Sequence, residues 1–238
     1  MHTIEDLEDM VAWKIPALGR RDAETNLAIL ELLALDGPKT VWGTNKDLGR
    51  NRLQYPTIFR AVARLRKGRY LKRTRYVKME KRKERTPEFG ITWRGFLASM
   101  TSDKVCKNIP DALRSNPQLD LPVPREVFFD LVGSLWNREQ IEEISWIIFE
   151  KVIETLPYDV ETTKDKLLLG YLFPALILAL PELEKYPPKK PEEVFKHPKV
   201  LEFFEKQIDH EIEKFQGTLQ ALQEGKQWLA RMKAKEGA

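Results

Sequence analysis

The residues that could do chemistry in this sequence are mainly basic, and they are concentrated in one segment. Between Lys46 and Arg94 there are 17 lysines and arginines against four acidic residues, so this segment carries a net charge of +13. Because the whole chain carries +4, the rest of the sequence carries −9. A compact basic block is typical of modules that bind nucleic acid. A basic face that contacts solvent alone is the alternative interpretation.

The other reactive residue types are few and do not have the spacing of a known site. A single cysteine, Cys106, excludes an intramolecular disulfide framework and any zinc site built from several thiolates. The acidic cluster at 159–165 lacks the carboxylate–x–Lys spacing of metal-dependent nucleases, and acids at a helix N-terminus explain it better. No two of the three histidines have ligand spacing: His2, His197 and His210. The sequence therefore predicts no enzyme, no metal site and no cofactor.

Length and composition fit a folded chain. It has 238 residues, of which 42% are hydrophobic and 32% charged, which is typical of globular proteins with a core. The first ten residues, MHTIEDLEDM, lack the basic-then-apolar order of a secretion signal. The longest nearly apolar stretch, 167–180, contains Pro174 and has 14 residues, whereas a membrane span needs about 20. We therefore expect a cytoplasmic protein without a membrane partner.

Helical patterns lead into the basic block. Apolar spacing predicts a helix over about 23–36 that Gly37 and the following proline end. A short helix capped by Thr44 or Asn45 follows. The next helix opens at Tyr55-Pro56, since proline is favoured at the first helical position, and Gly68 is the expected C-terminal stop.

The pattern then changes to strands. Residues 70–79 mix β-branched, aromatic and basic side chains, and a second short strand is predicted over 89–93. A charged tip at 81–87 separates these strands, and a helix restarts over 94–100. An amphipathic helical arm at 1–23 is expected to precede the whole arrangement.

Three stretches of this region carry a resemblance: YPTIFRAVARLRKG at 55–68, RYLKRTRYV at 69–77 and ITWRGFLASM at 91–100. The first two resemble the recognition helix and first wing strand of PadR-like and MarR-like winged helix-turn-helix transcription regulators. The third resembles the strand and helix that close the wing. The resemblance covers about residues 24–102. It implies a prokaryotic regulator that binds double-stranded DNA as a homodimer and associates with the nucleoid.

Helical geometry assigns roles within the predicted recognition helix. Positions advance 100° per residue, so burying its apolar side leaves one polar face. Arg60 is the best candidate for reading a base, because guanidinium matches the O6 and N7 acceptors of guanine. Tyr55 and Thr57 suit a phosphate or a thymine methyl group, while Arg64 and Lys67 suit phosphates. The face opposite the apolar side comprises Pro56, Thr57, Arg60, Arg64 and Lys67.

The basic residues at the wing tip suit the adjacent minor groove or its backbone. Together with the helix, they define a predicted DNA interface within the basic block. The candidate DNA-binding residues are Lys46, Arg52, Tyr55, Thr57, Arg60, Arg64, Lys67, Lys81, Arg82, Lys83 and Arg85.

The remainder of the chain reads as a linker and a helical domain. Prolines predict a linker at 103–124, and apolar spacing predicts helices throughout 125–238. A small-molecule effector could bind between these helices, but core packing is the ordinary explanation of their aromatic residues. We expect helices at about 125–136, 138–156, 163–180 and 198–235.

The last helix has a heptad-like stripe that predicts a dimer contact. Its apolar residues fall at alternating steps of three and four once Lys226 is counted. Packing against helices of the same chain is the alternative. The candidate dimerisation residues are Ile208, Ile212, Phe215, Leu219, Leu222 and Leu229.

The predicted fold class is mainly α with a small β wing, a winged helix-turn-helix domain followed by an all-helical domain. A sequence-specific regulator is the leading functional hypothesis. The first alternative is a non-regulatory winged-helix protein, such as an architectural, replication or segregation factor or an assembly subunit. An enzyme with an accessory winged helix ranks last, because no nucleophile or phosphate loop supports it.

Overall fold

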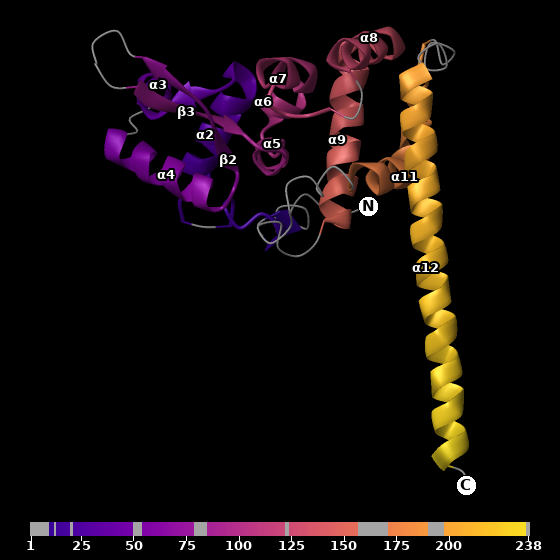
Figure 1. Cartoon of the computed structure of the whole chain (residues 1–238). Coiled ribbons are helices and arrows are strands. Elements are labelled where there is room, and N and C mark those ends of the chain that lie inside the picture. The colour runs from indigo at the N-terminus through magenta and orange to yellow at the C-terminus, as the bar shows by residue number, and fades with distance from the viewer. Residues whose placement is uncertain are drawn as a thin grey trace. The chain divides into compact units, whose positions relative to one another are not determined.

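The computed structural model describes the chain in several stretches, which form two compact units. One unit comprises 1–121 with 136–189, and the other comprises 122–135 with 190–238. The described residues are 10–11, 13–19, 21–49, 54–78, 85–121, 124–156, 171–189 and 198–236. Figure 1 labels the elements: α2 (Ala23–Asp36), β1 (Lys39–Thr40), α3 (Val41–Leu48), α4 (Tyr55–Lys67), β2 (Leu71–Lys78), β3 (Arg85–Ile91), α5 (Trp93–Ser99), α6 (Asp103–Cys106), α7 (Ile109–Ser115), α8 (Arg125–Leu135), α9 (Arg138–Thr155), α11 (Leu172–Leu183) and α12 (Pro198–Glu236).

The first unit begins with a winged-helix-like arrangement. Its elements follow the order α2, β1, α3, α4, β2, β3, and the three strands form an antiparallel sheet in the order β1-β3-β2. The predicted fold class, mainly helical with a small wing, is confirmed. Strand β1, which pairs Lys39 with Phe89, is not predicted from the sequence, because two residues are too few to show strand periodicity.

The start of α3 differs from the sequence prediction, whereas α4 ends at Gly68 as predicted. Helix α3 starts at Val41, four residues early, because the Thr40 hydroxyl accepts a hydrogen bond from the Gly43 N–H at 3.0 Å. After α4 the left-handed residue is Arg69, with φ 61°, whereas Gly68 has φ −74°. The Tyr70 N–H donates to the Leu65 carbonyl across this turn at 2.9 Å, so a Schellman-type closure ends the helix.

At two positions near helix ends, glycine is required because the backbone of another segment approaches closely. Gly37 ends α2 with φ 82°, and a Cβ there would meet the Ser115 carbonyl oxygen at 2.4 Å. A Cβ on Gly95 would meet the Tyr70 carbonyl oxygen at 2.2 Å, so this glycine lets α5 approach the start of β2. The Thr92 hydroxyl caps α5 by accepting from the Gly95 N–H.

The core of this part joins α2, α4 and the sheet. Its fully buried apolar side chains come from the faces that the helical spacing indicates, and they position α4 on the body of the unit. They include Ile29, Leu30, Leu33, Ile58, Leu65 and Ile91.

The linker predicted for 103–124 is wrong over 103–115. These residues form α6 and α7, both of which pack on α2. Asn116 is fully buried, and its side-chain amide donates to the carbonyls of Leu33 and Ala34 at 3.1 and 2.7 Å. The Leu33 carbonyl also accepts from the Gly37 N–H at 3.1 Å, so the Asn116 amide gives it a second donor and gives Ala34 a side-chain donor at the C-terminal end of α2. Pro110 lies in the first turn of α7, where proline favours a helix start, and does not belong to a tether.

The helical half is also divided differently from the predicted single domain at 125–238. Helices α9 and α11 belong to the same unit as the winged part, while α8 and α12 form the other unit. The predicted helix over 163–180 begins at Leu172 among the described residues, and 163–170 lie outside them.

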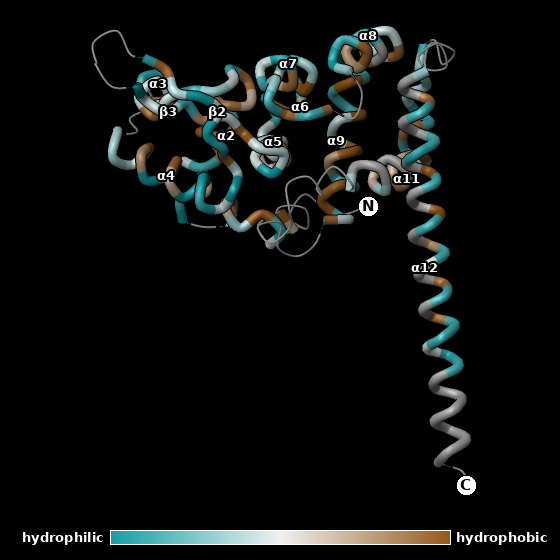
Figure 2. The backbone as a smooth tube through the Cα atoms, viewed as in Figure 1, coloured by the Kyte–Doolittle hydropathy of each residue, from teal (hydrophilic) through white to brown (hydrophobic). Residues whose placement is uncertain are grey.

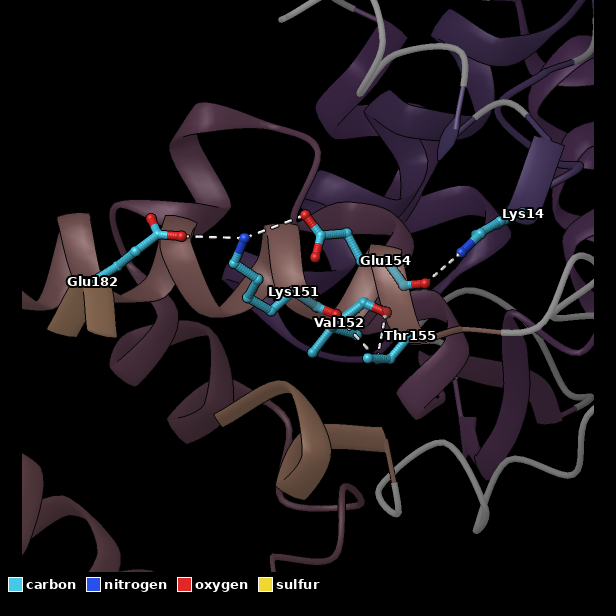
Figure 3. Close-up of polar contacts among 6 residues, drawn as sticks. All are labelled: Lys14, Lys151, Val152, Glu154, Thr155 and Glu182. Carbon is cyan, nitrogen blue, oxygen red and sulfur yellow. Dashed lines mark hydrogen bonds and ion pairs between the residues drawn. The ribbon is translucent and has the colours of Figure 1, made fainter. Parts of the chain in front are cut away.

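Lys14 joins the N-terminal arm to α9. Its ammonium group donates to the Ile153 carbonyl at 2.6 Å. It also donates to the Glu154 carbonyl at 2.9 Å (Figure 3). A cation at a helix C-terminus interacts favourably with the last carbonyl groups. Burial lowers the pKa of Lys14, and the nearby Glu154 carboxylate offsets part of this effect.

Lys151 joins α9 to α11. Its side chain, 15% exposed, lies between the carboxylates of Glu154 and Glu182 at 3.2 and 3.1 Å (Figure 3). Burial by itself lowers the pKa of Lys151, but the hydrogen bonds to Glu182 and Glu154 outweigh it, so the pKa lies above its ordinary value. We assign this cluster to holding the helices together.

The second unit contains α8 and the long helix α12. With 39 residues, α12 extends about 58 Å. Hydrophobic positions recur along it between hydrophilic ones (Figure 2). This pattern leaves a series of large apolar side chains exposed: Ile208, Ile212, Phe215, Leu219 and Leu222.

Candidate nucleic-acid interface

Helix α4 has the two faces that the sequence predicts. Its buried residues are Ile58, Ala61, Val62 and Leu65. Among the candidate contacts on the other side, Tyr55, Arg60, Arg64 and Lys67 are exposed and Thr57 is half-buried. In Figure 1 the N-terminus of α4 lies on the side of the unit where β2 ends and β3 begins. The helix and the wing strands can therefore face one ligand together.

Arg60 occupies the middle of the exposed face. Its Nε donates to the Pro56 carbonyl at 3.2 Å, so the side chain lies back along the helix toward the N-terminus. This bond uses one of the five N–H donors of the guanidinium group. The geometry directs a bidentate donor toward the end of the helix that enters a groove first in helix-turn-helix proteins.

Arg64 has an intramolecular partner that the sequence did not reveal. Its Nη2 lies 2.9 Å from a carboxylate oxygen of Asp22, just before α2. Both side chains are more than one third exposed, so the pair is screened by water and contributes little to stability. A phosphate would have to compete with Asp22 for Arg64, whereas Lys67 and Arg66 are exposed on the last turn.

Phe59 is a candidate contact that the charge-based interpretation of α4 missed. It is 54% exposed and stacks on Tyr55, itself 44% exposed, with ring centroids 6.3 Å apart. The spacing of four residues places both rings on one side of the helix. A large apolar residue four positions from an aromatic, outside the buried stripe, was the available sequence signal.

Lys46 lies on the last turn of α3 and is exposed. Its ammonium group is 6.0 Å from the ring centroid of Trp42, which is also exposed. A cation held near an aromatic face keeps its charge available at the surface. Arg52, another candidate contact, lies outside the described residues.

Strand β2 adds cations that are not among the predicted DNA contacts. Arg73 stacks over the Tyr76 ring at 4.8 Å and hydrogen-bonds its hydroxyl group. The strand lies at the edge of the sheet, where exposed charges also prevent pairing with another strand. A β-bulge at Thr74 interrupts the register of β2 with β3. The exposed residues of β2 are Lys72, Arg73, Arg75, Tyr76 and Lys78.

The wing tip is only partly described. Arg85 is the first residue of β3 and is exposed. Lys81, Arg82 and Lys83 lie outside the described residues, so their assignment remains a prediction.

The basic block is not uniformly at the surface. Arg94 is only 1% exposed, and its Nη1 donates to the Gly68 carbonyl at 2.7 Å. Arg75 pairs with the buried Glu88 at 2.7 Å, and this hydrogen bond raises the pKa of Arg75. Eleven basic residues of the block are nevertheless exposed: Lys46, Arg60, Arg64, Arg66, Lys67, Arg69, Lys72, Arg73, Arg75, Lys78 and Arg85. The described part of the block therefore presents an extended basic surface.

The residues predicted to form a dimer contact lie along α12. The five whose side chains are described are 48–72% exposed. The side chain of Leu229 is outside the described set. The heptad-like stripe is thus available on the surface of its own unit.

The described residues contain no group of three or more histidines, cysteines or acids that could hold a metal ion. Within the same residues, no helix has the length and apolar character required to cross a membrane. Cys106 is buried, and burial raises the pKa of its thiol to about 12, with Asp103 adding to the effect. Such a thiol is a poor nucleophile.

The fold and this basic face define a winged-helix-like protein with a cationic surface. No family model and no solved structure match the chain. A stretch of 103 residues, 42% of the chain, is 29% identical to tRNA (guanine(37)-N(1))/4-demethylwyosine(37)-methyltransferase Taw22 of Nanoarchaeum equitans (strain Kin4-M). The similarity covers 32% of that protein, so this chain spans about a third of the length of the curated relative that it matches.

Proposed function

We propose that this chain is a transcription regulator that binds specific sites on double-stranded DNA as a homodimer and catalyses no reaction. The observation that carries the proposal is the face of α4, where exposed Arg60, Arg64 and Lys67 lie opposite a fully buried apolar side. A helix held in this way on a small basic module suits the major groove. The regulator would act in the cytoplasm, at the nucleoid.

Arg60 and the other cations would divide the work of recognition. The Arg60 guanidinium can donate two hydrogen bonds to a guanine edge, which distinguishes sequences. Arg66 and Lys67 at the end of α4 would contact phosphates, which position the helix without specifying a base. Lys72, Lys78 and the tip of the wing would extend the phosphate contacts beyond the groove that α4 occupies.

A second copy of the chain would complete the DNA-binding protein through α12. Burying the exposed stripe against another α12 would remove its large apolar side chains from water. Two linked modules could then contact half-sites about 34–36 Å apart on one duplex. The linkage would also raise the effective concentration of the second module and strengthen binding.

Selection of bound duplexes from a random-sequence pool by the full-length chain tests the proposal. We expect enrichment of a two-fold symmetric or nearly symmetric site, and tighter binding of that site than of its scrambled version by at least 10³-fold. Equal binding of every duplex would contradict sequence-specific regulation and favour an architectural role. No binding of any duplex at low salt would favour a winged helix that contacts protein.

The similarity to a tRNA methyltransferase supports a second candidate, binding of structured RNA through the same basic surface. A-form RNA has a deep, narrow major groove that does not admit α4. Two competition titrations separate the candidates: the labelled enriched duplex is displaced from the chain either by unlabelled duplex or by a folded tRNA. If tRNA displaces the duplex at a lower concentration than unlabelled duplex does, the result favours the RNA candidate.

A further inference from the structure

The most unusual feature of the exposed face of α4 is its apolar flank. Phe59 is more than half exposed, although a phenyl ring gains free energy when it leaves water. Tyr55 stacks on it, and Ala63 lies one further helical turn along the same flank. The flank therefore presents a continuous apolar strip beside the cations of the face.

The strip and Arg60 point in different directions. Phe59 and Arg60 are consecutive, so their side chains project about 100° apart around the helix axis. Arg60 and Arg64 then lie on one flank, and Tyr55 and Phe59 lie on the other. A helix in the major groove with this arrangement would place the two flanks against different base pairs.

The base edge that matches an apolar flank is that of thymine. Thymine alone among the four bases carries a methyl group in the major groove, and phenylalanine is one of the side chains that contacts it. A phenyl ring offers a phosphate no hydrogen bond, so the surrounding cations bind the backbone and leave the ring for a base edge. The stacked Tyr55 ring limits the movement of Phe59 and holds it in place.

We propose that Tyr55 and Phe59 form a subsite that reads the 5-methyl group of a thymine, at a base pair next to the one that Arg60 contacts. This inference rests on the proposed binding of double-stranded DNA. It specifies which base the apolar flank of α4 would contact.

Replacing single thymines by uracil tests the subsite with the protein unchanged, because deoxyuridine lacks only the 5-methyl group. The probe is the duplex that the full-length chain enriches from a random pool, with each thymine replaced in turn by deoxyuridine. We expect one replacement to weaken binding about fourfold, which corresponds to about 0.8 kcal/mol for one buried methyl. Replacements elsewhere should leave the affinity within twofold.

Variants then connect that base to Phe59. In Phe59→Ala, the difference between thymine and uracil at this position should disappear, and in Phe59→Leu it should be reduced. The matched control is Trp13→Ala, which removes an exposed aromatic of the N-terminal arm and should keep the fourfold difference. Circular dichroism of each variant checks that the chain folds.

These experiments distinguish failure of the thymine subsite from failure of the proposed DNA binding. If no duplex is enriched, the DNA-binding proposal itself fails. If a site is enriched but uracil is accepted equally at every thymine, or the difference persists in Phe59→Ala, the thymine subsite is wrong. In that case the stacked pair only stabilises α4 as neighbours four residues apart.

Discussion

At the scale of single residues, Cys106 illustrates how burial decides reactivity. Its thiol donates to the Met100 carbonyl at 3.1 Å, and burial raises its pKa to about 12. We predict no reaction with a disulfide reagent at pH 8 in the native state and reaction of one thiol per chain after unfolding in urea. Reaction of the native protein at the rate of free cysteine would contradict the buried environment.

The same residue makes a prediction about pH. An unfolded thiol has its ordinary pKa of 9.0, and the folded one has a pKa of about 12, so the unfolded state loses its proton first. The contribution of Cys106 to stability is therefore complete below pH 9 and is lost as the pH rises toward 12. We expect the free energy of unfolding, measured in urea, to fall between pH 8 and pH 10.5. This fall should be smaller for Cys106→Ala than for the natural sequence.

Arg69 has a backbone conformation that is unfavourable for a residue with a side chain. A non-glycine residue in the left-handed region costs about 1–2 kcal/mol, and Arg69 has φ 61°. We predict that Arg69→Gly raises the free energy of unfolding by about 1 kcal/mol in urea titrations. Arg69→Ala is the matched control, because alanine keeps the Cβ that causes the strain. Equal stability of the two variants would contradict this account.

At the scale of elements, the sequence predicts those whose signals are long and local. Helix α4 was predicted because Pro56 marks its start and four apolar residues share one face. Strand β1 was missed because two residues carry no periodicity. Helices α6 and α7 were mistaken for a linker because proline is as common at the first turn of a helix as in a tether.

Side-chain contacts between distant elements could not be predicted from the sequence, for a different reason. The burial of Arg94 and the pairing of Arg64 with Asp22 depend on packing that brings separate segments together. A count of charges does not show which of the 17 basic residues of the block are buried. Phe59 was overlooked because the candidate contacts of α4 were chosen by charge, although helical spacing places Phe59 outside the buried stripe.

The packing of α7 on α2 predicts a cost for Asn116→Ala. Removing this amide leaves the buried carbonyls of Leu33 and Ala34 without their side-chain donor, so we expect a loss of about 1–3 kcal/mol in stability. The matched control is Asn108→Ala, whose side chain donates to the Lys104 carbonyl and accepts from the Arg138 guanidinium, both at the surface. Similar losses for both variants in urea titrations would contradict a special role for Asn116.

Helix α12 predicts a change in oligomeric state. Phe215→Asp combined with Leu222→Asp places charges in the exposed apolar stripe, so the proposed dimer should dissociate. The control is Gln216→Asp with Gln223→Asp, which adds the same charges at exposed positions beside the stripe. Light scattering at micromolar concentration measures both. A natural sequence that is already monomeric would contradict dimerisation through α12.

At the scale of the whole molecule, the uneven charge should appear in the salt dependence of binding. If Lys81, Arg82 and Lys83 contact phosphates, replacing all three by alanine should weaken binding to every duplex. The slope of log affinity against log salt should shrink by up to about 0.9 for each lost contact. An unchanged slope in titrations at several salt concentrations would show that the tip does not touch the backbone.

The central claim, that α4 reads bases in duplex DNA, is tested most directly by one comparison of Arg60→Ala with Arg66→Ala. Both remove an exposed arginine of α4, and each is titrated with the enriched duplex and with its scrambled version. The account predicts that Arg60→Ala costs about 1–3 kcal/mol on the enriched duplex and much less on the scrambled one, while Arg66→Ala weakens both alike. Equal losses on both duplexes for Arg60→Ala would contradict it.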